Sequence, residues 1–166
     1  ITNFTETMNF AGRMYVIPET TENSTLKSLR DLIAKGKIDE YKYDRRIINI
    51  GVSDEPFWVI IPFSSISNQE RWIFTTGGRM EGRQGNYNLF EVFDLQTETQ
   101  ILSSNRGAAI NTSVPDKFYL SLPAKQERIL AFHIRGTSGT LTTFTPEIYN
   151  ATLSFPGKGI LSWLGI

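Results

Sequence analysis

The chain of 166 residues contains no cysteine and a single histidine, and these two scarcities exclude several kinds of site. Without cysteine there is no disulfide, no thiolate metal ligand and no cysteine nucleophile. A Ser-His-Asp triad would have to use His133, and no serine lies in a Gly-x-Ser-x-Gly motif. One imidazole also makes a poor basis for a transition-metal site. We therefore predict no catalytic residue, no metal and no cofactor, and a chain that is not an enzyme.

An excess of either charge and a long hydrophobic run are also missing. Lys plus Arg and Asp plus Glu both number 17, so the formal net charge is zero. A neutral chain has no overall field to attract nucleic acid or an anionic bilayer, and we expect neither as a partner. No run reaches the roughly 20 apolar residues of a membrane span. Residues 159–166 are apolar but short, and they are compatible with a strand, a tail or the approach to a membrane segment.

What the sequence has is short apolar segments separated by turn residues. Aromatic residues make up 12% of the chain, which suits strands. The predicted strands are 13–18, 47–50, 57–63, 70–76, 86–94, 99–103, 117–122, 128–135 and 140–145. Their spacing of about ten residues predicts an all-β, jelly-roll-like antiparallel β-sandwich, with residues 1–158 as one domain. Pro62 cannot donate to a ladder and predicts a bulge or an edge position.

One short helix is predicted near the N-terminus, over residues 25–35. Ser24 or Thr25 can cap its start, and Gly36 is placed to end it through a left-handed residue. Leucines and an isoleucine at helical spacing form one apolar face, which we expect to dock on the sandwich. The charged face, with Lys27, Arg30 and Asp31, is interpreted as a solvated face.

Loop residues supply the candidate ligand site. Rings can stack on sugar C–H surfaces, while Arg, Asp and Asn side chains can hydrogen-bond hydroxyl groups. The candidates are Arg79, Arg83, Asn86 and Tyr87 around the glycine-rich segment 77–85, and Asp54, with Glu55, before Trp58. Strand alternation places Tyr87 with Leu89, Glu91 and Phe93. Trp58 and Trp72 are interpreted as core residues, and His133, opposite Phe132 and Ile134, as a surface or partly buried residue with satisfied nitrogens.

The order of several segments resembles a known family. Gly51-Val52-Ser53, the strand 57–63 and then Glu70-Arg71-Trp72-Ile73-Phe74 are similar in order and spacing to a periplasmic sensor domain. That domain is the second type of extracellular domain in bacterial seven-transmembrane receptors with diverse intracellular signalling modules. Segments 87–94, 118–123 and 129–139 continue the similarity, which covers residues 45–150.

The resemblance implies a jelly-roll sandwich, similar to carbohydrate-binding modules, on the periplasmic face of the bacterial inner membrane. Its ligand would be a carbohydrate or another small molecule, and binding would shift a two-state arrangement, with homodimer packing as a candidate. The parent protein would be membrane-anchored, and residues 159–166 would approach the first membrane helix. The family often has an Asp directly after this glycine and an Arg several residues later, whereas here Ala108 follows Gly107 and no Arg occurs between Gly107 and Lys117. This departure predicts a different ligand or none.

Two other functions stay open. The chain could be a free-standing carbohydrate-binding module that binds polymeric sugar without signalling. It could also be a sandwich whose partner is a periplasmic protein.

Overall fold

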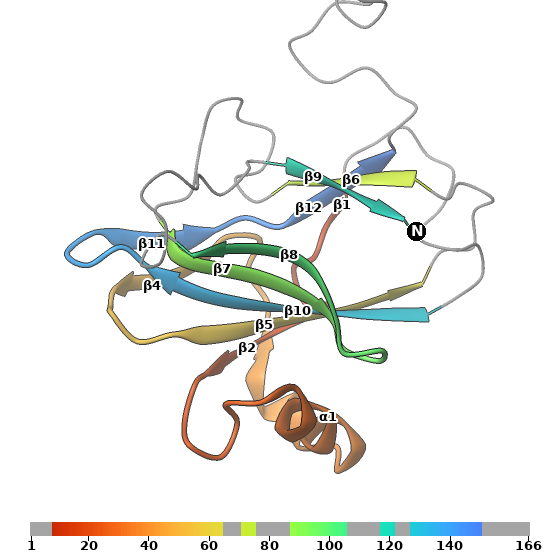
Figure 1. The fold of residues 1–166 in the computed structure, drawn as a ribbon, viewed down its shortest axis with the longest axis horizontal. Helices are drawn as coiled ribbons and strands as arrows, with labels where there is room; N and C mark the ends of the chain where they lie inside the picture. Colours follow the sequence, from red (N-terminus) through yellow and green to blue (C-terminus); the bar gives the residue numbers. More distant parts are fainter. Residues whose placement is uncertain (1–7, 65–70, 76–86, 106–116, 122–126, 151–166) are drawn as a thin grey trace, which may run out of the picture.

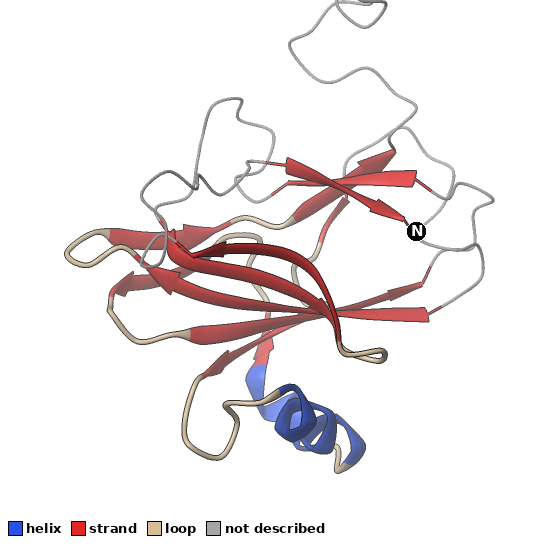
Figure 2. Cartoon of the chain, viewed as in Figure 1, coloured by secondary structure: helices blue, strands red, loops and turns tan. Residues whose placement is uncertain are grey.

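The computed structural model describes residues 8–64, 71–75, 87–105, 117–121 and 127–150, and the strands in these ranges pair antiparallel (Figures 1 and 2). The strands are β1 (Met8–Asn9), β2 (Met14–Pro18), β3 (Lys42–Tyr43), β4 (Ile48–Val52), β5 (Phe57–Ser64), β6 (Arg71–Thr75), β7 (Tyr87–Asp94), β8 (Thr99–Asn105), β9 (Lys117–Ser121), β10 (Glu127–Gly136), β11 (Leu141–Phe144) and β12 (Glu147–Asn150). Two helices lie in the same ranges, α1 (Leu26–Ala34) and the 3₁₀ helix η1 (Lys37–Tyr41).

The strands form two main sheets with a helix outside them. A six-stranded sheet has the order β3-β2-β5-β10-β7-β8, and a four-stranded sheet has the order β1-β12-β6-β9. Strands β11 and β4 make a separate pair. Figure 1 shows the four-stranded sheet above the six-stranded one and α1 below it. The chain passes from β5 to β6 to β7 and from β8 to β9 to β10, so it changes sheet repeatedly. This confirms the predicted all-β, jelly-roll-like antiparallel sandwich with one α-helix.

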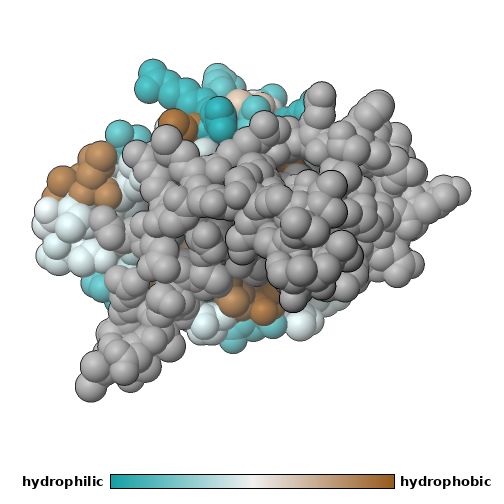
Figure 3. Space-filling model, turned by 90° about the horizontal axis from the view of Figure 1, so that it is seen from above, coloured by the Kyte–Doolittle hydropathy of each residue, from teal (hydrophilic) through white to brown (hydrophobic). Residues whose placement is uncertain are grey.

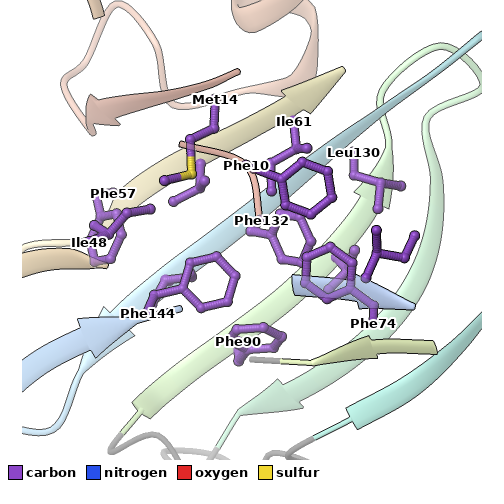
Figure 4. Close-up of a cluster of buried hydrophobic side chains, with 14 of the residues drawn as sticks. Phe10, Met14, Ile48, Phe57, Ile61, Phe74, Phe90, Leu130, Phe132 and Phe144 are labelled. Atoms are coloured by element: carbon purple, nitrogen blue, oxygen red, sulfur yellow. The ribbon is translucent and has the colours of Figure 1, made fainter. Parts of the chain in front are cut away.

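The main core fills the space between the sheets (Figure 4). Phe132 of β10 and Phe90 of β7 come from the six-stranded sheet, Phe74 of β6 comes from the four-stranded sheet, and Phe144 comes from β11. The centroid of the Phe132 ring lies 5.0 Å from that of Phe74 and 5.3 Å from that of Phe144. Burial of such rings supplies the largest share of the apolar area on which a sandwich depends.

The two central strands are buried on both faces, which explains their near-continuous apolar sequences. In β5, Val59 and Ile61 join the main core, while Trp58 and Ile60 join a second cluster on the opposite face. Strand β10 divides in the same way, with Ala131 in the second cluster. Burial on both faces removes the polar alternation that marks a strand with one wet side. The interpretation of Trp58 as a core residue is confirmed, since 3% of it is exposed.

Helix α1 covers the outer face of the six-stranded sheet, as expected. Thr25 is its N-cap, and the side chains and backbone N–H groups of Thr25 and Ser28 bond reciprocally in a capping box. Gly36, with φ 69°, follows the C-cap in the left-handed conformation. Leu29 is fully buried against Ile17 and Trp58 in the second cluster. The first 45 residues therefore include structure that packs on the sandwich.

Three short strands and η1 were not predicted. β1 and β3 have two residues each, too few to show an alternation, and β12 mixes Glu147 with apolar residues. The predicted edge character of Pro62 fits the pairing, because β2 pairs with β5 only over residues 57–60. On the side of β5 that faces β2, Pro62 lies past that pairing.

Exposed apolar side chains occur on the β4–β11 pair. Val52 and Leu141 are register partners and are 66% and 53% exposed. In the space-filling view, brown surface gathers at the left end, where Figure 1 has these strands (Figure 3). Among the described residues, no helix is long and apolar enough to cross a membrane. The predicted apolar tail, 159–166, and Trp72's side chain lie outside what the structure describes.

Candidate functional site

A polar cleft of about 460 Å³ lies between the loop after β2, one side of α1 and η1. Its lining residues are Pro18, Thr20, Glu22, Asn23, Ser28, Asp31, Leu32, Lys35, Lys37 and Tyr41. The volume falls in the range of roughly 300–1,000 Å³ that is usual for small-molecule sites. All of these residues come from one stretch of 24 positions, 18–41, so the cleft is built locally on the outer face of the sheet.

The loop wall of the cleft is held by one buried amide. Asn23 is 6% exposed, its Oδ1 accepts from the N–H of Thr20 at 2.6 Å, and its Nδ2 donates to the carbonyl of Pro18 at 3.0 Å. In this turn the side-chain amide of Asn23 takes the place of a backbone hydrogen-bonding partner. Because Asn23 is committed in this way, it acts as a support for the wall, and the groups free to meet a ligand are its neighbours.

The helix wall presents residues from successive turns. Ser28 and Asp31 lie at i and i+3 of α1, and Lys35, its C-cap, lies at i+7, and such positions share one side of a helix. η1 adds Lys37 and Tyr41. The wall therefore offers a carboxylate, two ammonium groups and one phenol ring within a single opening. This set can hydrogen-bond hydroxyl groups and pair with ligand charges of either sign.

A second polar cluster lies on the same outer face of the sheet, around His133 of β10. The Nε2 atom of His133 is 3.1 Å from a carboxylate oxygen of Glu19, and its Nδ1 atom is 3.3 Å from one of Glu91. The imidazole stacks on the Trp58 ring, with centroids 4.1 Å apart and planes 9° apart. Of the two interpretations of His133, surface or partly buried, the partly buried one is confirmed. Both ring nitrogens face carboxylates of residues that the sequence did not single out.

Two of the five predicted binding residues, Asp54 and Tyr87, lie within the described structure. Arg79, Arg83 and Asn86 lie outside the described residues. Asp54 is exposed in the connection between β4 and β5. Tyr87 needs a correction, because its side chain is 1% exposed and its hydroxyl donates to the carbonyl of Thr143 at 2.6 Å. Tyr87 is a core residue that also ties β7 to β11.

A β-bulge explains why Tyr87 does not follow its strand. Arg135 of β10 pairs with Leu89, and the next residue, Gly136, pairs with Tyr87, so Asn88 is left without a partner in the register. An extra residue of this kind rotates the chain beyond it. Tyr87 consequently faces the main core together with Phe90, whereas simple alternation had placed it with Leu89.

Replacing Tyr87 by phenylalanine should change how stability depends on alkaline pH. Burial raises the pKa of the Tyr87 hydroxyl, so above the unfolded-state value of about 10 only the unfolded chain loses this proton. Stability from this group is therefore complete below pH 10 and falls as the pH rises, by about 1.4 kcal/mol at pH 11. At pH 7, Tyr87→Phe should cost about 1 kcal/mol through the lost hydrogen bond.

Urea unfolding of both proteins at pH 7 and pH 11 measures this difference. At pH 7 the free energy of unfolding of Tyr87→Phe should be lower than that of the unmodified chain. At pH 11 this difference should shrink to near zero or reverse. A deficit that is equal at the two pH values would show that Tyr87 does not resist ionisation.

The residues of the cleft were missed because their sequence pattern has an ordinary explanation. Asp31 was assigned to a solvated helix face, and it is indeed exposed. The available signal was the recurrence of polar residues at 28, 31 and 35 directly after an Asn-containing loop. No group of three or more His, Asp or Glu side chains that could hold a metal ion occurs within the described ranges.

Comparison with known proteins finds neither a matching family model nor a matching curated protein. Among solved structures, a β-glucosidase from Kluyveromyces marxianus in complex with glucose is similar over 83% of this chain, with 14% identity and a TM-score of 0.42. The match covers 16% of that enzyme. Another similar structure is the family 32 carbohydrate-binding module of Clostridium perfringens NanJ in complex with galactose. The match covers 87% of this chain and 100% of that module. Its identity is 9% and its TM-score 0.38.

A third similar structure is the module CBM32-1 from a family 31 glycoside hydrolase of Clostridium perfringens. The match covers 86% of this chain and 97% of that module, with 10% sequence identity and a TM-score of 0.38. These solved structures are similar to this chain. The sandwich architecture itself is observed in the two sheets of this chain.

Proposed function

We propose that this chain is a non-enzymatic ligand-binding domain, and that its ligand is a carbohydrate or another small polar molecule held in the cleft beside α1. The observation that carries the proposal is the lining of the cleft. A loop braced by the Asn23 side chain and a capped helix present polar groups of both charges, together with Tyr41, in one opening. Polar groups held by a fixed framework bind a ligand with little ordering cost.

The biological setting is part of the same proposal. The order of the segments from Gly51 to Gly139 resembles the periplasmic sensor domain of seven-transmembrane receptors. We place the domain at the periplasmic face of a bacterial inner membrane, in a membrane-anchored receptor, with a homodimer as the candidate signalling form. Ligand binding would act by favouring one of two arrangements, which requires different affinities for the two.

A thermal-shift screen of the purified domain against monosaccharides, oligosaccharides, nucleotides and amino acids tests the ligand. A compound that binds only the folded state must raise the melting temperature in a dose-dependent way. Asp31→Ala and Lys37→Ala should each weaken the affinity for the compound found by about tenfold or more, because each removes a hydrogen bond to a charged group.

The matched controls are Asp39→Ala and Lys27→Ala, two exposed residues of η1 and α1 that do not line the cleft. They should leave the affinity unchanged. If Asp31→Ala has no effect while Arg79→Ala abolishes the shift, the ligand site belongs to the glycine-rich segment and the cleft is excluded. If no compound shifts the domain at millimolar concentration, a protein partner replaces a small molecule. Membrane spans following residue 166 in the full-length protein would support the receptor, and a hydrolase domain would support a free-standing module.

A further inference from the structure

The side chains of Glu19, His133 and Glu91 meet in one cluster, although they come from three different strands or strand ends. Glu19 directly follows β2, His133 lies in β10 and Glu91 lies in β7. His133 and Glu91 are register partners, as are His133 and Trp58 of β5. Since β5 lies between β2 and β10 in the sheet, the Glu19 side chain reaches across β5 to bond the imidazole. The cluster therefore joins the end of β2 to the centre of the sheet.

The cluster is well sheltered. The side chains of His133, Glu19 and Glu91 are 16%, 18% and 23% exposed. The flat face of the imidazole is covered by Trp58, which is 3% exposed. The stacked ring fixes the plane of the imidazole, so each nitrogen is aimed at one carboxylate. Solvent has limited access with which to replace either contact.

With both carboxylates ionised, both contacts can be hydrogen bonds only when the imidazole carries two protons. A doubly protonated histidine donates from both nitrogens, whereas the neutral ring has one donor and one acceptor. An ionised carboxylate is an acceptor only, so the neutral ring would set a lone pair against one of the two glutamates. Histidine is the side chain that ordinarily changes charge between about pH 5 and 8. Loss of one proton therefore breaks one of the two contacts.

Other charges around the ring do not replace these partners. Glu19, from the end of β2, and Glu91, from β7, are the charged groups bonded to it, and β5 contributes the uncharged Trp58. Arg135 follows on the same face of β10. Of the other basic residues near this face, Arg30 of α1 pairs with Glu98. The Arg128–Asp94 pair lies on the opposite face, since Asp94 is the register partner of the core residue Leu130.

The two glutamates differ in what they hold. Glu91 lies within β7, which pairs with β10 on one side and β8 on the other, so its backbone stays in place without the contact. Glu19 follows the last residue of β2, and its backbone is held by one bond from its N–H to the carbonyl of Pro56 at 3.1 Å. The next residues, Thr20 to Asn23, form the loop wall of the cleft.

We propose that Glu19, His133 and Glu91 form a proton-controlled clamp on the loop that walls the cleft. With the imidazole doubly protonated, Glu19 is bonded and the loop wall is held. The neutral imidazole keeps a single N–H, and in the tautomer that carries it on Nδ1 the hydrogen bond to Glu19 is lost. The loop wall then opens more often, which lowers the affinity of the cleft. The domain thereby responds to the acidity of its surroundings. The effect on affinity rests on the proposed function, whereas the proton-linked movement of the loop does not.

The clamp is tested without a ligand, on the whole chain, by NMR. His133 is the only histidine, so its ring signals report its protonation without ambiguity. Hydrogen exchange of the Glu19, Thr20 and Asn23 amides reports the loop, after correction for the intrinsic dependence of exchange on pH. As the ring loses its proton, these amides should exchange about tenfold faster, which is the factor for losing one hydrogen bond to a charged group.

His133→Gln should abolish this step, and Glu19→Gln should reduce it, while Glu98→Gln, which removes an exposed carboxylate elsewhere, should leave it intact. The clamp is overturned if the loop amides of the unmodified chain show no step at the ring titration, or if the step persists in His133→Gln. The measurement on the unmodified chain stands by itself should a variant fail to fold. A clamp that works in a domain with no small-molecule ligand would reject the proposed function alone.

Discussion

Replacing Phe132 by alanine should lower the free energy of unfolding by about 3–5 kcal/mol, the usual cost of deleting a buried phenylalanine ring. The reason is its position between layers. Phe132 is fully buried, and its ring contacts those of Phe74, Phe90 and Phe144, which come from three different strands (Figure 4). Removal of the ring leaves a cavity that the two sheets cannot close without moving together, so the transfer and cavity costs add.

The matched control for Phe132 is Phe93, a phenylalanine on the other face of the same sheet. Phe93 is partly buried and lies 6.2 Å from the Trp58 ring. Phe93→Ala should cost less than half as much, because the site opens to solvent and leaves no closed cavity. Urea unfolding at 25 °C with equal m-values measures both. Equal losses for the two variants would show that the space between the sheets is not the dominant core.

Gly136→Ala should also destabilise the fold severely, although it adds a single methyl group. A Cβ atom at Gly136 would lie 2.9 Å from Cβ and 3.2 Å from Cγ2 of Thr142, and closer still to its Oγ1. Thr142 is 1% exposed, so its side chain cannot turn away into solvent. Overpacking of a tight site usually costs about 1–3 kcal/mol and occasionally more. We expect this site at or above the upper end.

Two further variants separate the clash from a general cost of losing glycine. Gly139 has φ 75° and no atom within 4 Å of an added Cβ. Gly139→Ala should therefore lower the free energy of unfolding by only about 1–2 kcal/mol, the cost of a left-handed backbone at a residue with a Cβ. The double variant Gly136→Ala with Thr142→Gly removes the opposing side chain. Its loss should be smaller than the sum of the two single losses. If the stability losses of the two single variants simply add in the double variant, as measured by thermal or urea unfolding, the Gly136–Thr142 contact is not the source of the destabilisation.

The site proposed for binding is separated from the core that determines stability. The cleft and the His133 cluster lie on the outer face of the six-stranded sheet, while the phenylalanine cluster lies on the inner face. Exposed residues such as Asp31 and Lys37 can therefore be changed without entering either hydrophobic cluster. Loss of binding in these variants should occur at an unchanged melting temperature, which separates a binding role from a folding role.

Much of the fold follows from patterns that span only a few residues. The apolar run of β5 predicted a strand, and Thr25 and Gly36 predicted the two ends of α1. Capping bonds and side-chain alternation depend on neighbours within about four positions, so the sequence contains them. The presence of one histidine and no cysteine likewise limits the chemistry that this chain can perform in any fold.

The surroundings of Tyr87 and His133 were decided by contacts between distant segments. Tyr87 faces the core because of a bulge that exists only in its pairing with β10, and alternation alone placed it wrongly. His133 meets partners 114 and 42 residues away, and the register of four strands brings them together. Sequence by itself determined the sandwich class, the helix and the absence of a thiol. Only the tertiary structure decided which polar residues converge at His133 and which way Tyr87 faces, because register and bulges arise from long-range pairing that local periodicity does not encode.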